Sequence, residues 1–396
     1  MAYELLSKTY YKNRSGYEQE YLTRFNSLSA SHLNFLIHGN PAFFIQTEEM
    51  VSLLYQILLT DKQVTQVKTK LPGQAIQQYY VKSLIEEIHQ SLNIEQINST
   101  RKEISETRKK QKEDRLLGMI TRYDALLTQE PIALQSCADI RQLYDEICLP
   151  EVKKENPDNI PDGEWYRKQP VQVYSSTDKV IHTGLFPESA IINAMDQALS
   201  ILQDESINIL YRTAIFHYLF GYIHPFYDGN GRLARFISSY MLSHTLDPLI
   251  GVRISYTINE GRTKYYTMFK EGNDPKNKGD LTPFIIGFLQ ILSTAYLRLH
   301  EALESRVERM KRCEQTIDQI LTEKKQQLIA FLLLQVSLFA SEGITLPEIV
   351  QNTSVGYTTV KRFLDSKIGR TMLPATKDGK RKLYKLDLEW LDQQIQ

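Results

Sequence analysis

Apolar residues recur at helical spacing along most of the chain, which predicts a mainly α-helical fold. The first 110 residues are predicted to be helical throughout. One helix begins behind a cap at Thr47 and continues through "EEMVSLLYQILLTDKQV", and a second amphipathic helix covers 74–96. Residues 100–117 are charged throughout, which favours a solvated helix or a linker.

The middle of the chain is predicted to be helical with one interruption. "VQVYSSTDKVIHTG" (171–184) alternates and has β-branched residues on both sides of "SSTD", which is typical of a β-hairpin. Helical spacing resumes at 187–202. The stretch 207–223 is apolar nearly all round and predicts a central buried helix, which Pro225 ends; another helix follows the glycines after it.

The last hundred residues have a different pattern. One or two long helices are expected over 284–340. Residues 345–368 then predict a helix, a short turn and a second helix, and two short strands follow around the "KDGK" turn. This order is typical of a winged helix-turn-helix. The predicted domains are 1–117, 118–300 and 301–396.

Charge, cysteine content and the lengths of apolar runs indicate the compartment in which the protein is expected. The 396 residues have no formal net charge, so attraction to nucleic acid would need a local patch. The three cysteines form no CxxC pair, which favours a reducing compartment. The first residues have no apolar signal-peptide core, and no run of eighteen apolar residues predicts a transmembrane helix. We therefore expect a cytoplasmic protein that does not associate with a membrane.

Residues that could bind phosphate, hold a metal ion or accept a proton occur close together in "IHPFYDGNGRLARF" (223–236). A helix that begins near Gly229 presents free N–H groups and the positive end of its dipole, which is typical of a phosphate site. Arg232 and Arg235 add cationic forks on one helical face. Asp228 is a candidate Mg²⁺ ligand, and His224 is a candidate base near neutral pH. Together they indicate phosphoryl or nucleotidyl transfer.

Three other interpretations of this segment were weighed. A dinucleotide fingerprint is disfavoured because no predicted strand precedes Gly229 and the third glycine is missing. A transition-metal site at His224 and Asp228 lacks a third His or Cys nearby. A purely structural turn would not bring so many functional residue types together.

The segment resembles the signature of the Fic family, His-Pro-Phe-x-Asp-Gly-Asn-Gly-Arg-x-x-Arg, at every fixed position. The resemblance extends over about residues 85–290 and implies a helical bundle with a β-hairpin flap. It implies transfer of AMP from ATP to a Ser, Thr or Tyr hydroxyl of a target protein.

The resemblance also implies a role for each residue. His224 would be the base, and Asp228 would hold Mg²⁺. The N–H groups around Gly229, Asn230 and Gly231, together with Arg232 and Arg235, would bind the phosphates. Phe226 would anchor the loop in the core, and the hairpin 171–184 would hold the target by strand addition. Tyr265, Tyr266 and Asn273 stand where the family contacts the nucleoside. His217, on the buried helix, is interpreted as a core histidine.

"SLNIEQ" (91–96) is similar to the family's inhibitory motif, [Ser/Thr]-x-x-x-Glu-[Gly/Asn]. The resemblance implies that Ser91 and Glu95 lie in an inhibitory helix and that Glu95 pairs with Arg235 in place of the γ-phosphate. Gln96 departs from the pattern, because Gly or Asn is usual at that position.

The tail carries an excess of positive charge over 361–385. The candidate DNA contacts are on the second predicted helix and in the wing: Tyr357, Thr358, Thr359, Lys361, Arg362, Lys380 and Arg381. A winged helix that serves as a protein-contact or dimerisation module is the alternative.

Several functions stay open at this level. The first is an adenylyltransferase restrained by Glu95, which uses ATP as substrate with Mg²⁺. The alternatives are a DNA-binding regulator whose Fic domain senses nucleotide, an enzyme that removes AMP, and transfer of UMP or phosphocholine. The target, the DNA site and the oligomeric state, including a homodimer, are not fixed by the sequence.

Overall fold

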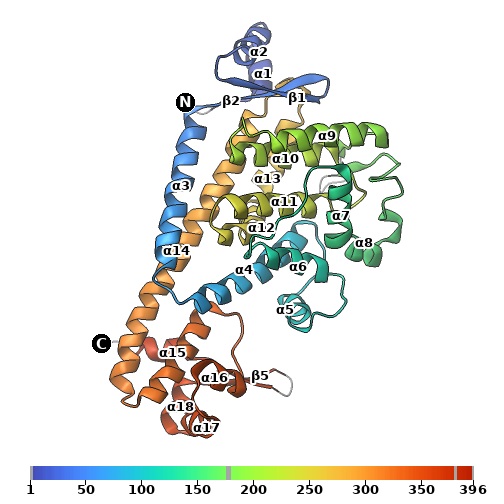
Figure 1. Ribbon diagram of the computed structural model, residues 1–396. Helices are drawn as coiled ribbons and strands as arrows, with labels where there is room; N and C mark the ends of the chain where they lie inside the picture. The colour runs from blue at the N-terminus through green and yellow to red at the C-terminus, as the bar shows by residue number, and fades with distance from the viewer. Residues whose placement is uncertain (1–2, 175–179, 379–380, 395–396) are drawn as a thin grey trace. The chain divides into compact units, whose positions relative to one another are not determined.

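The computed structural model describes residues 3–174, 180–378 and 381–394. It divides into two compact units: Met1–Asp61 with Leu84–Leu297, and Lys62–Ser83 with Arg298–Gln396. Helices make up most of each unit (Figure 1), so the prediction of a mainly α-helical fold is confirmed.

The first unit contains helices that run up to the first part of α14, three short 3-10 turns and two hairpins. The elements that lie in it wholly or in part are α1 (Leu6–Lys12), α2 (Tyr17–Phe25), β1 (Ala30–Ile37), β2 (Asn40–Ile45), α3 (Glu48–Lys68), α4 (Gly73–Ile94), α5 (Arg101–Lys110), α6 (Leu117–Ala125), α7 (Cys137–Ile147), α8 (Leu149–Glu155), η1 (Pro157–Asn159), β3 (Gln172–Tyr174), β4 (Val180–Thr183), α9 (Glu188–Gln203), α10 (Ile209–Ile223), α11 (Asn230–Thr245), η2 (Pro248–Val252), α12 (Ile254–Glu260), α13 (Arg262–Gly272), η3 (Pro275–Asn277) and α14 (Thr282–Ile320).

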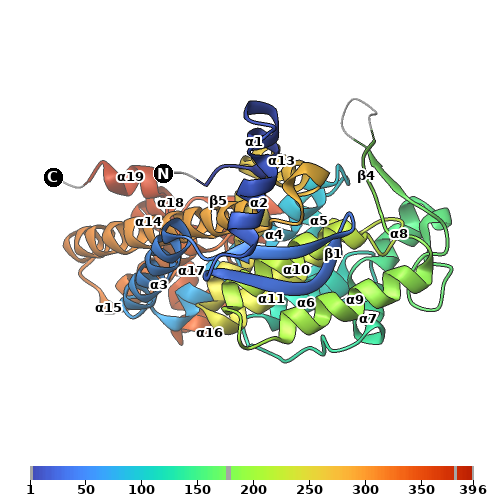
Figure 2. The same cartoon turned by 90° about the horizontal axis from the view of Figure 1, so that it is seen from above.

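The core of this unit is built around α10. It is buried on nearly every side, because its sequence "ILYRTAIFHYLFGYI" is apolar almost all round, and α9 and α11 pack against it. In Figure 2 these three helices lie side by side. The predicted buried helix, the helix before it and the helix after the glycines are all confirmed.

The prediction that residues 1–110 are entirely helical is wrong at 30–45. There β1 and β2 form an antiparallel hairpin around a turn in which His38 and Gly39 both have positive φ. Along β1 the side chains alternate, with Leu33, Phe35 and Ile37 buried. The hairpin packs on α10 (Figure 2), where Phe35 meets Tyr222 edge to face.

The hairpin predicted at 171–184 is present. β3 and β4 pair antiparallel, with Gln172 opposite Thr183 and Val173 opposite His182. Residues 175–179 lie outside the described residues. The charged run 100–117 contains α5, capped by Thr100 and Glu103, and α5 buries Ile104, so one of its faces packs against the protein instead of being fully solvated.

The second unit contains the ends of α3 and α14, the start of α4, and the tail. The tail elements are α15 (Lys324–Phe339), α16 (Leu346–Thr353), α17 (Tyr357–Asp365), α18 (Lys367–Met372), β5 (Ala375–Asp378), β6 (Arg381–Tyr384) and α19 (Leu388–Asp392). The predicted long helices, the helix–turn–helix and the hairpin are present, whereas α18 and α19 were not predicted.

Among the residues that the structure describes, one helix is long and apolar enough to cross a membrane by length and composition alone. It is α14, and 67% of its most apolar window is buried inside the structure. A buried core helix passes the same test, because partners in the core favour the same apolar side chains as lipid does.

Candidate active site between two buried helices

The candidate base, His224, lies at the point where α10 ends. Its backbone is left-handed (φ 51°), and its N–H donates to the Phe220 carbonyl, which closes the last turn. Pro225 cannot continue the helix, so the chain turns here. The imidazole is therefore carried by a rigid element.

The imidazole of His224 is half-buried beside other basic groups. Burial, the nearby His182 and the positive charge of Arg167 together lower the pKa of His224 to about 4. At neutral pH the ring is therefore uncharged and has a lone pair available to accept a proton.

Between the two helices, the loop from Phe226 to Asn230 is closed by side-chain contacts. Phe226 is fully buried and stacks on Tyr144, with ring centroids 3.7 Å apart. Asn230 Oδ1 accepts from the Phe226 N–H at 2.9 Å, and Asn230 Nδ2 donates to the Phe226 carbonyl at 2.8 Å. Gly229 has φ 82°, and a β-carbon there would lie 3.0 Å from Cys148 Cβ.

The start of α11 supplies backbone donors. The first intrahelical bond runs from the Leu233 N–H to the Gly229 carbonyl, so the N–H groups of Asn230, Gly231 and Arg232 precede it. The Gly229 N–H donates instead to Asp228 Oδ1. Of the N–H groups that the sequence assigned to an anion site, that of Gly229 is therefore already paired, whereas those of Asn230 and Gly231 precede the first intrahelical bond.

Glu95 lies against both predicted arginines. Its Oε1 accepts from Arg235 Nη2 at 2.8 Å, and its Oε2 accepts from Arg232 Nε at 2.7 Å. Burial opposes the charge of Glu95, but Arg235 and Arg232 outweigh it, so the pKa of Glu95 lies below its ordinary value. In the sequence, Arg235 lies 140 residues after Glu95 and Arg232 lies 137 residues after it.

Ser91, one turn before Glu95, also binds Arg235. Its Oγ accepts from Arg235 Nε at 3.1 Å, and its carbonyl accepts from Arg235 Nη2 at 2.8 Å. Gln96 follows at φ 61°, the left-handed conformation that Gly or Asn adopts most easily. The departure from the family pattern at Gln96 therefore leaves Glu95 in place.

Sequence reasoning missed Glu151, a second carboxylate on Arg232. Glu151 is buried at the start of α8 and forms an ion pair with Arg232 Nη1. Burial raises the pKa of Glu151, and Arg232 opposes that rise. Arg232 Nη2 also donates to Asp228 Oδ1 at 2.9 Å. An acid in the first turn of a short helix is common, so no signal in the sequence singles out Glu151.

Arg167 was also missed, although it is fully buried beside His224. Its guanidinium donates to three backbone carbonyls: His224 at 3.0 Å, Gln169 at 2.6 Å and Leu185 at 2.7 Å. These carbonyls lie after α10 and on both sides of the β3–β4 hairpin. Burial lowers the pKa of Arg167. Every residue has a backbone carbonyl, so residue types do not show which carbonyls will bind a guanidinium. No sequence pattern therefore predicts the role of Arg167.

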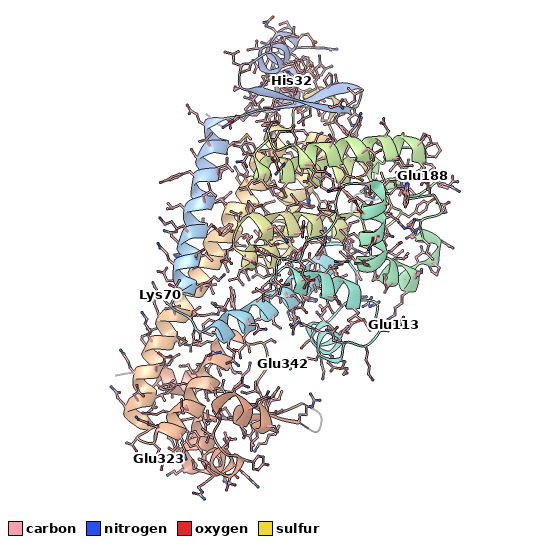
Figure 3. The ribbon with its side chains drawn as sticks, viewed as in Figure 1. His32, Lys70, Glu113, Glu188, Glu323 and Glu342 are labelled. Carbon is pink, nitrogen blue, oxygen red and sulfur yellow. The ribbon has the colours of Figure 1, made fainter. Side chains whose placement is uncertain are left out.

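The segment that carries Arg167 is held from its other side by Glu188, which Figure 3 labels at the start of α9. Glu188 Oε1 accepts from the N–H groups of Trp165 and Tyr166, each at 3.0 Å. The base of the hairpin also approaches closely. A β-carbon on Gly184 would lie 2.9 Å from His224 Cβ, so only glycine lets the hairpin pass there.

The three candidate nucleoside residues lie on and after α13. Tyr265 is buried, and its hydroxyl hydrogen-bonds to His217 Nε2 at 2.7 Å. Tyr266 is 40% exposed and donates to the Ile94 carbonyl at 3.2 Å, next to Glu95. Asn273 accepts from Tyr218 at 2.8 Å. His217 is fully buried, as predicted for a core histidine.

Asp228 is the only candidate magnesium ligand named from the sequence. Its Oδ1 accepts from the Gly229 N–H and from Arg232 Nη2, while Oδ2 has no hydrogen-bond partner among the residues that the structure describes. A single carboxylate with a free oxygen beside a phosphate cradle fits Mg²⁺, which takes one or two carboxylates plus substrate phosphates. Within the described ranges no three His, Cys, Asp or Glu side chains gather as a metal site.

The candidate DNA contacts lie on α17 and β6, in the second unit. Tyr357, Thr358, Lys361 and Arg362 are exposed and Thr359 is half-buried. Arg381 is exposed on β6, and Lys380 lies outside the described residues.

Part of the chain is similar to known proteins. Residues 135–242 match the model of the Fic/DOC family. The chain is 27% identical over 156 residues to protein adenylyltransferase fic-1 of Caenorhabditis elegans, a match that covers 38% of this chain and 28% of that protein. It is 33% identical over 94 residues to protein adenylyltransferase Fic of Nematostella vectensis, covering 24% and 20%. The chain thus matches less than a third of the length of either relative.

A solved structure extends the likeness of fold beyond that segment. A Fic family protein from Desulfovibrio desulfuricans G20 superposes with a TM-score of 0.53 at 19% identity, over 86% of this chain and 97% of that one. The chain therefore contains a segment of the Fic/DOC family at residues 135–242, on a fold similar to that of this Fic family protein.

Proposed function

We propose that this protein transfers AMP from ATP to a hydroxyl group of a target protein. The observation that supports the proposal most strongly is the arrangement of His224 and α11. A neutral imidazole ends one buried helix, and the next helix begins six residues later with free N–H groups and two arginines. This is a base placed beside a site for a polyanion. Two partial relatives named as protein adenylyltransferases are consistent with it.

In the proposed reaction a Ser, Thr or Tyr hydroxyl of the target attacks the α-phosphorus of ATP. A bond forms between the target oxygen and that phosphorus, and the bond to the oxygen that bridges to the β-phosphate breaks. Pyrophosphate leaves, and His224 accepts the hydroxyl proton. Arg167 fixes the backbone of His224 and thereby the direction of the imidazole.

The phosphates would be bound by the start of α11. The N–H groups of Asn230, Gly231 and Arg232 point out of the helix, and the guanidinium groups of Arg232 and Arg235 would neutralise the β- and γ-phosphates. Asp228 would hold Mg²⁺ through Oδ2. When bound, Mg²⁺ would offset negative charge on the phosphates as pyrophosphate leaves.

We infer that Glu95 restrains this reaction. It is paired with both arginines, so a triphosphate that uses them has to displace its carboxylate. The two arginines are almost fully buried, and a buried charge without a partner is strongly unfavourable, so in the absence of ATP the Glu95 pair is stable. Displacement by phosphate then exchanges one set of charge-assisted hydrogen bonds for another.

The target would bind along the β3–β4 hairpin. This is a two-stranded sheet, and an extended target segment can add a strand to such an edge through main-chain hydrogen bonds. Main-chain pairing makes few demands on the target sequence.

The deciding experiment uses ATP labelled at the α- or the γ-phosphate, incubated with a cell lysate. Wild type, Glu95→Gly and the double variant Glu95→Gly/His224→Ala are compared. We expect label on protein from α-labelled ATP only, more of it with Glu95→Gly and about 10²–10⁴-fold less when His224 is also replaced. No transfer of α-label by Glu95→Gly would contradict the proposal.

The same assay separates the alternatives. Release of AMP from pre-labelled protein, without new transfer, would indicate the reverse reaction. ATP binding with neither outcome would indicate a nucleotide sensor. Labelled UTP or CDP-choline in parallel reactions would reveal transfer of UMP or phosphocholine.

A second candidate function is DNA binding by the tail. Exposed cationic side chains lie on α17, α18 and β6 of the second unit: Lys361, Arg362, Lys367, Arg370, Arg381 and Lys382. We infer phosphate contacts, with α17 as the recognition helix of a winged helix.

Binding to a random-sequence duplex should then weaken steeply as salt rises, and Arg381→Gln/Lys382→Gln should flatten the salt dependence by about two phosphate contacts. No shift of any duplex at low salt would instead favour a protein-contact module.

A further inference from the structure

The helix α3 has apolar side chains on two opposite faces. Met50 and Ile57 are fully buried, and this face lies along α14, where Gln290 donates to Glu49 and Tyr296 donates to Asp61. The other face carries Val51, Tyr55, Leu58 and Leu59, which are 47%, 69%, 55% and 44% exposed. We call these four residues the outer row.

The outer row is continuous in space. At 100° per residue its members fall within one third of the helix circumference, with Tyr55 near the middle, and they follow the spacing i, i+4, i+7, i+8. Single exposed apolar residues are common on protein surfaces, but a contiguous row on one helix is typical of an interaction surface. Folding of the chain alone does not explain this row.

The charges at the two ends of the row are of opposite sign. Glu48 lies seven residues before Tyr55 and Lys62 seven residues after it, and both are exposed on the same face of this continuous helix. Val51 and Leu59 likewise lie four residues on either side of Tyr55. The pattern is therefore self-complementary when the helix is reversed about Tyr55.

We propose that α3 binds α3 of a second copy of this chain, antiparallel, with the two-fold axis at Tyr55. In that register Tyr55 meets Tyr55 of the partner subunit, Val51 meets the partner's Leu59, and Glu48 meets the partner's Lys62. Two-fold symmetry requires each contact to occur twice, and the observed pattern satisfies that requirement. One helical face is smaller than the roughly 800 Å² per partner of a standard interface, so the dimer should be weak and concentration-dependent.

Disulfide trapping tests the register directly. In the full chain Tyr55→Cys should give a covalent dimer under mild oxidation, because the two introduced thiols face each other across the axis. The native cysteines, Cys137, Cys148 and Cys313, are buried and should not compete. The matched control is Gln56→Cys, which is exposed on the adjoining face and should give little covalent dimer. Equal cross-linking of the two variants would overturn the proposal.

Sedimentation of the full chain over a concentration series supplies the second test. Tyr55→Glu should raise the dimer Kd by at least about 100-fold, because it places two like charges at the axis, whereas Gln56→Glu should leave it unchanged. Glu48→Lys and Lys62→Glu should each weaken the dimer by about 2- to 30-fold, and the double variant should restore it. A chain that stays monomeric at every concentration, or a dimer indifferent to Tyr55→Glu, would overturn the proposal.

Discussion

Glu95 occupies the space that a side chain at position 231 would need. A β-carbon added to Gly231 would overlap Glu95 Oε1 and would lie 2.8 Å from Arg235 Nη1. The residue that follows α4 and the first turn of α11 are thus packed against each other without room for another atom. This contact makes the ion pair between Glu95 and Arg235 sensitive to the size of residue 231.

We therefore expect Gly231→Ala to destabilise the protein by about 1–3 kcal/mol, the usual range for an overpacked site. In the Glu95→Gly background the same change should cost less, because one of the two colliding groups is gone. Urea denaturation of the four proteins gives the coupling free energy. Gly73→Ala is the control, since nothing lies within 4 Å of a β-carbon there. Equal costs in both backgrounds would show that Glu95 does not fill the space.

Gln96→Gly should stabilise the protein. Gln96 has φ 61°, a conformation that costs a non-glycine residue about 1 kcal/mol or somewhat more. We expect a gain of about 1 kcal/mol in the free energy of unfolding, and a smaller gain for Gln96→Asn. Urea denaturation measures both. The matched control is Gln77→Gly, at an exposed position inside α4, which should lose stability by about 1 kcal/mol.

The imidazole of His224 should stay neutral well below the usual titration range. Its pKa is lowered to about 4, so NMR of the free protein should show no protonation of this ring between pH 8 and about pH 5. ATP bound to the Glu95→Gly variant brings negative charge close to the ring and should raise that pKa. His224→Ala assigns the signal. Titration near 6.5 without ATP would contradict the environment described here.

His217 makes the stability of the fold depend on pH. Burial and the charge of Arg235 lower its pKa to about 3, so between about pH 6.5 and pH 3 the unfolded chain binds a proton that the folded chain does not. Stability should therefore be complete above pH 6.5 and decrease as the pH falls, by about 1.4 kcal/mol per pH unit for this one group. His217→Gln should have a shallower slope in urea titrations from pH 7 to pH 5.

Replacing Arg167 by lysine should lower kcat and leave the affinity for ATP nearly unchanged. Lysine keeps the charge but cannot span the three carbonyls of His224, Gln169 and Leu185, so the imidazole and the hairpin lose their common support. In the Glu95→Gly background we expect Arg167→Lys to lower kcat on the order of 10²-fold, since small misplacements of a reacting group have effects of that size. Calorimetry should show an unchanged Kd for ATP. A large loss of ATP affinity would place Arg167 in the phosphate site.

The helices around the loop 224–235 could be predicted because their signals are local. The apolar run of α10, Pro225 and Gly229 each act within a few residues of where they stand. The β1–β2 hairpin was missed because "LNFLI" suits a helix as well as a strand. Its pairing depends on a turn at His38 and Gly39 and on a distant loop, where the Phe43 N–H donates to the Gly279 carbonyl.

The contacts of Arg232, Arg235 and Arg167 also include some that the sequence could indicate and some that it could not. Glu95 was named because it resembles a known inhibitory motif, and spacing alone would not have linked it to a residue 140 positions away. Glu151 and Arg167 have partners that only the folded chain brings together. A buried carboxylate on a short helix and a guanidinium on main-chain carbonyls both look like ordinary surface charges in the sequence.

Asn230 has a consequence for the lifetime of the protein. It precedes Gly231, and in an Asn-Gly pair the glycine nitrogen readily attacks the asparagine amide and releases ammonia. In the folded chain Asn230 is buried and both ends of its amide are held by the Phe226 backbone, which prevents that attack. An unfolded chain has no such protection, and the aspartate that it would form cannot donate to the Phe226 carbonyl. Prolonged unfolding should therefore turn a reversible loss of structure into permanent chemical damage at the loop between α10 and α11.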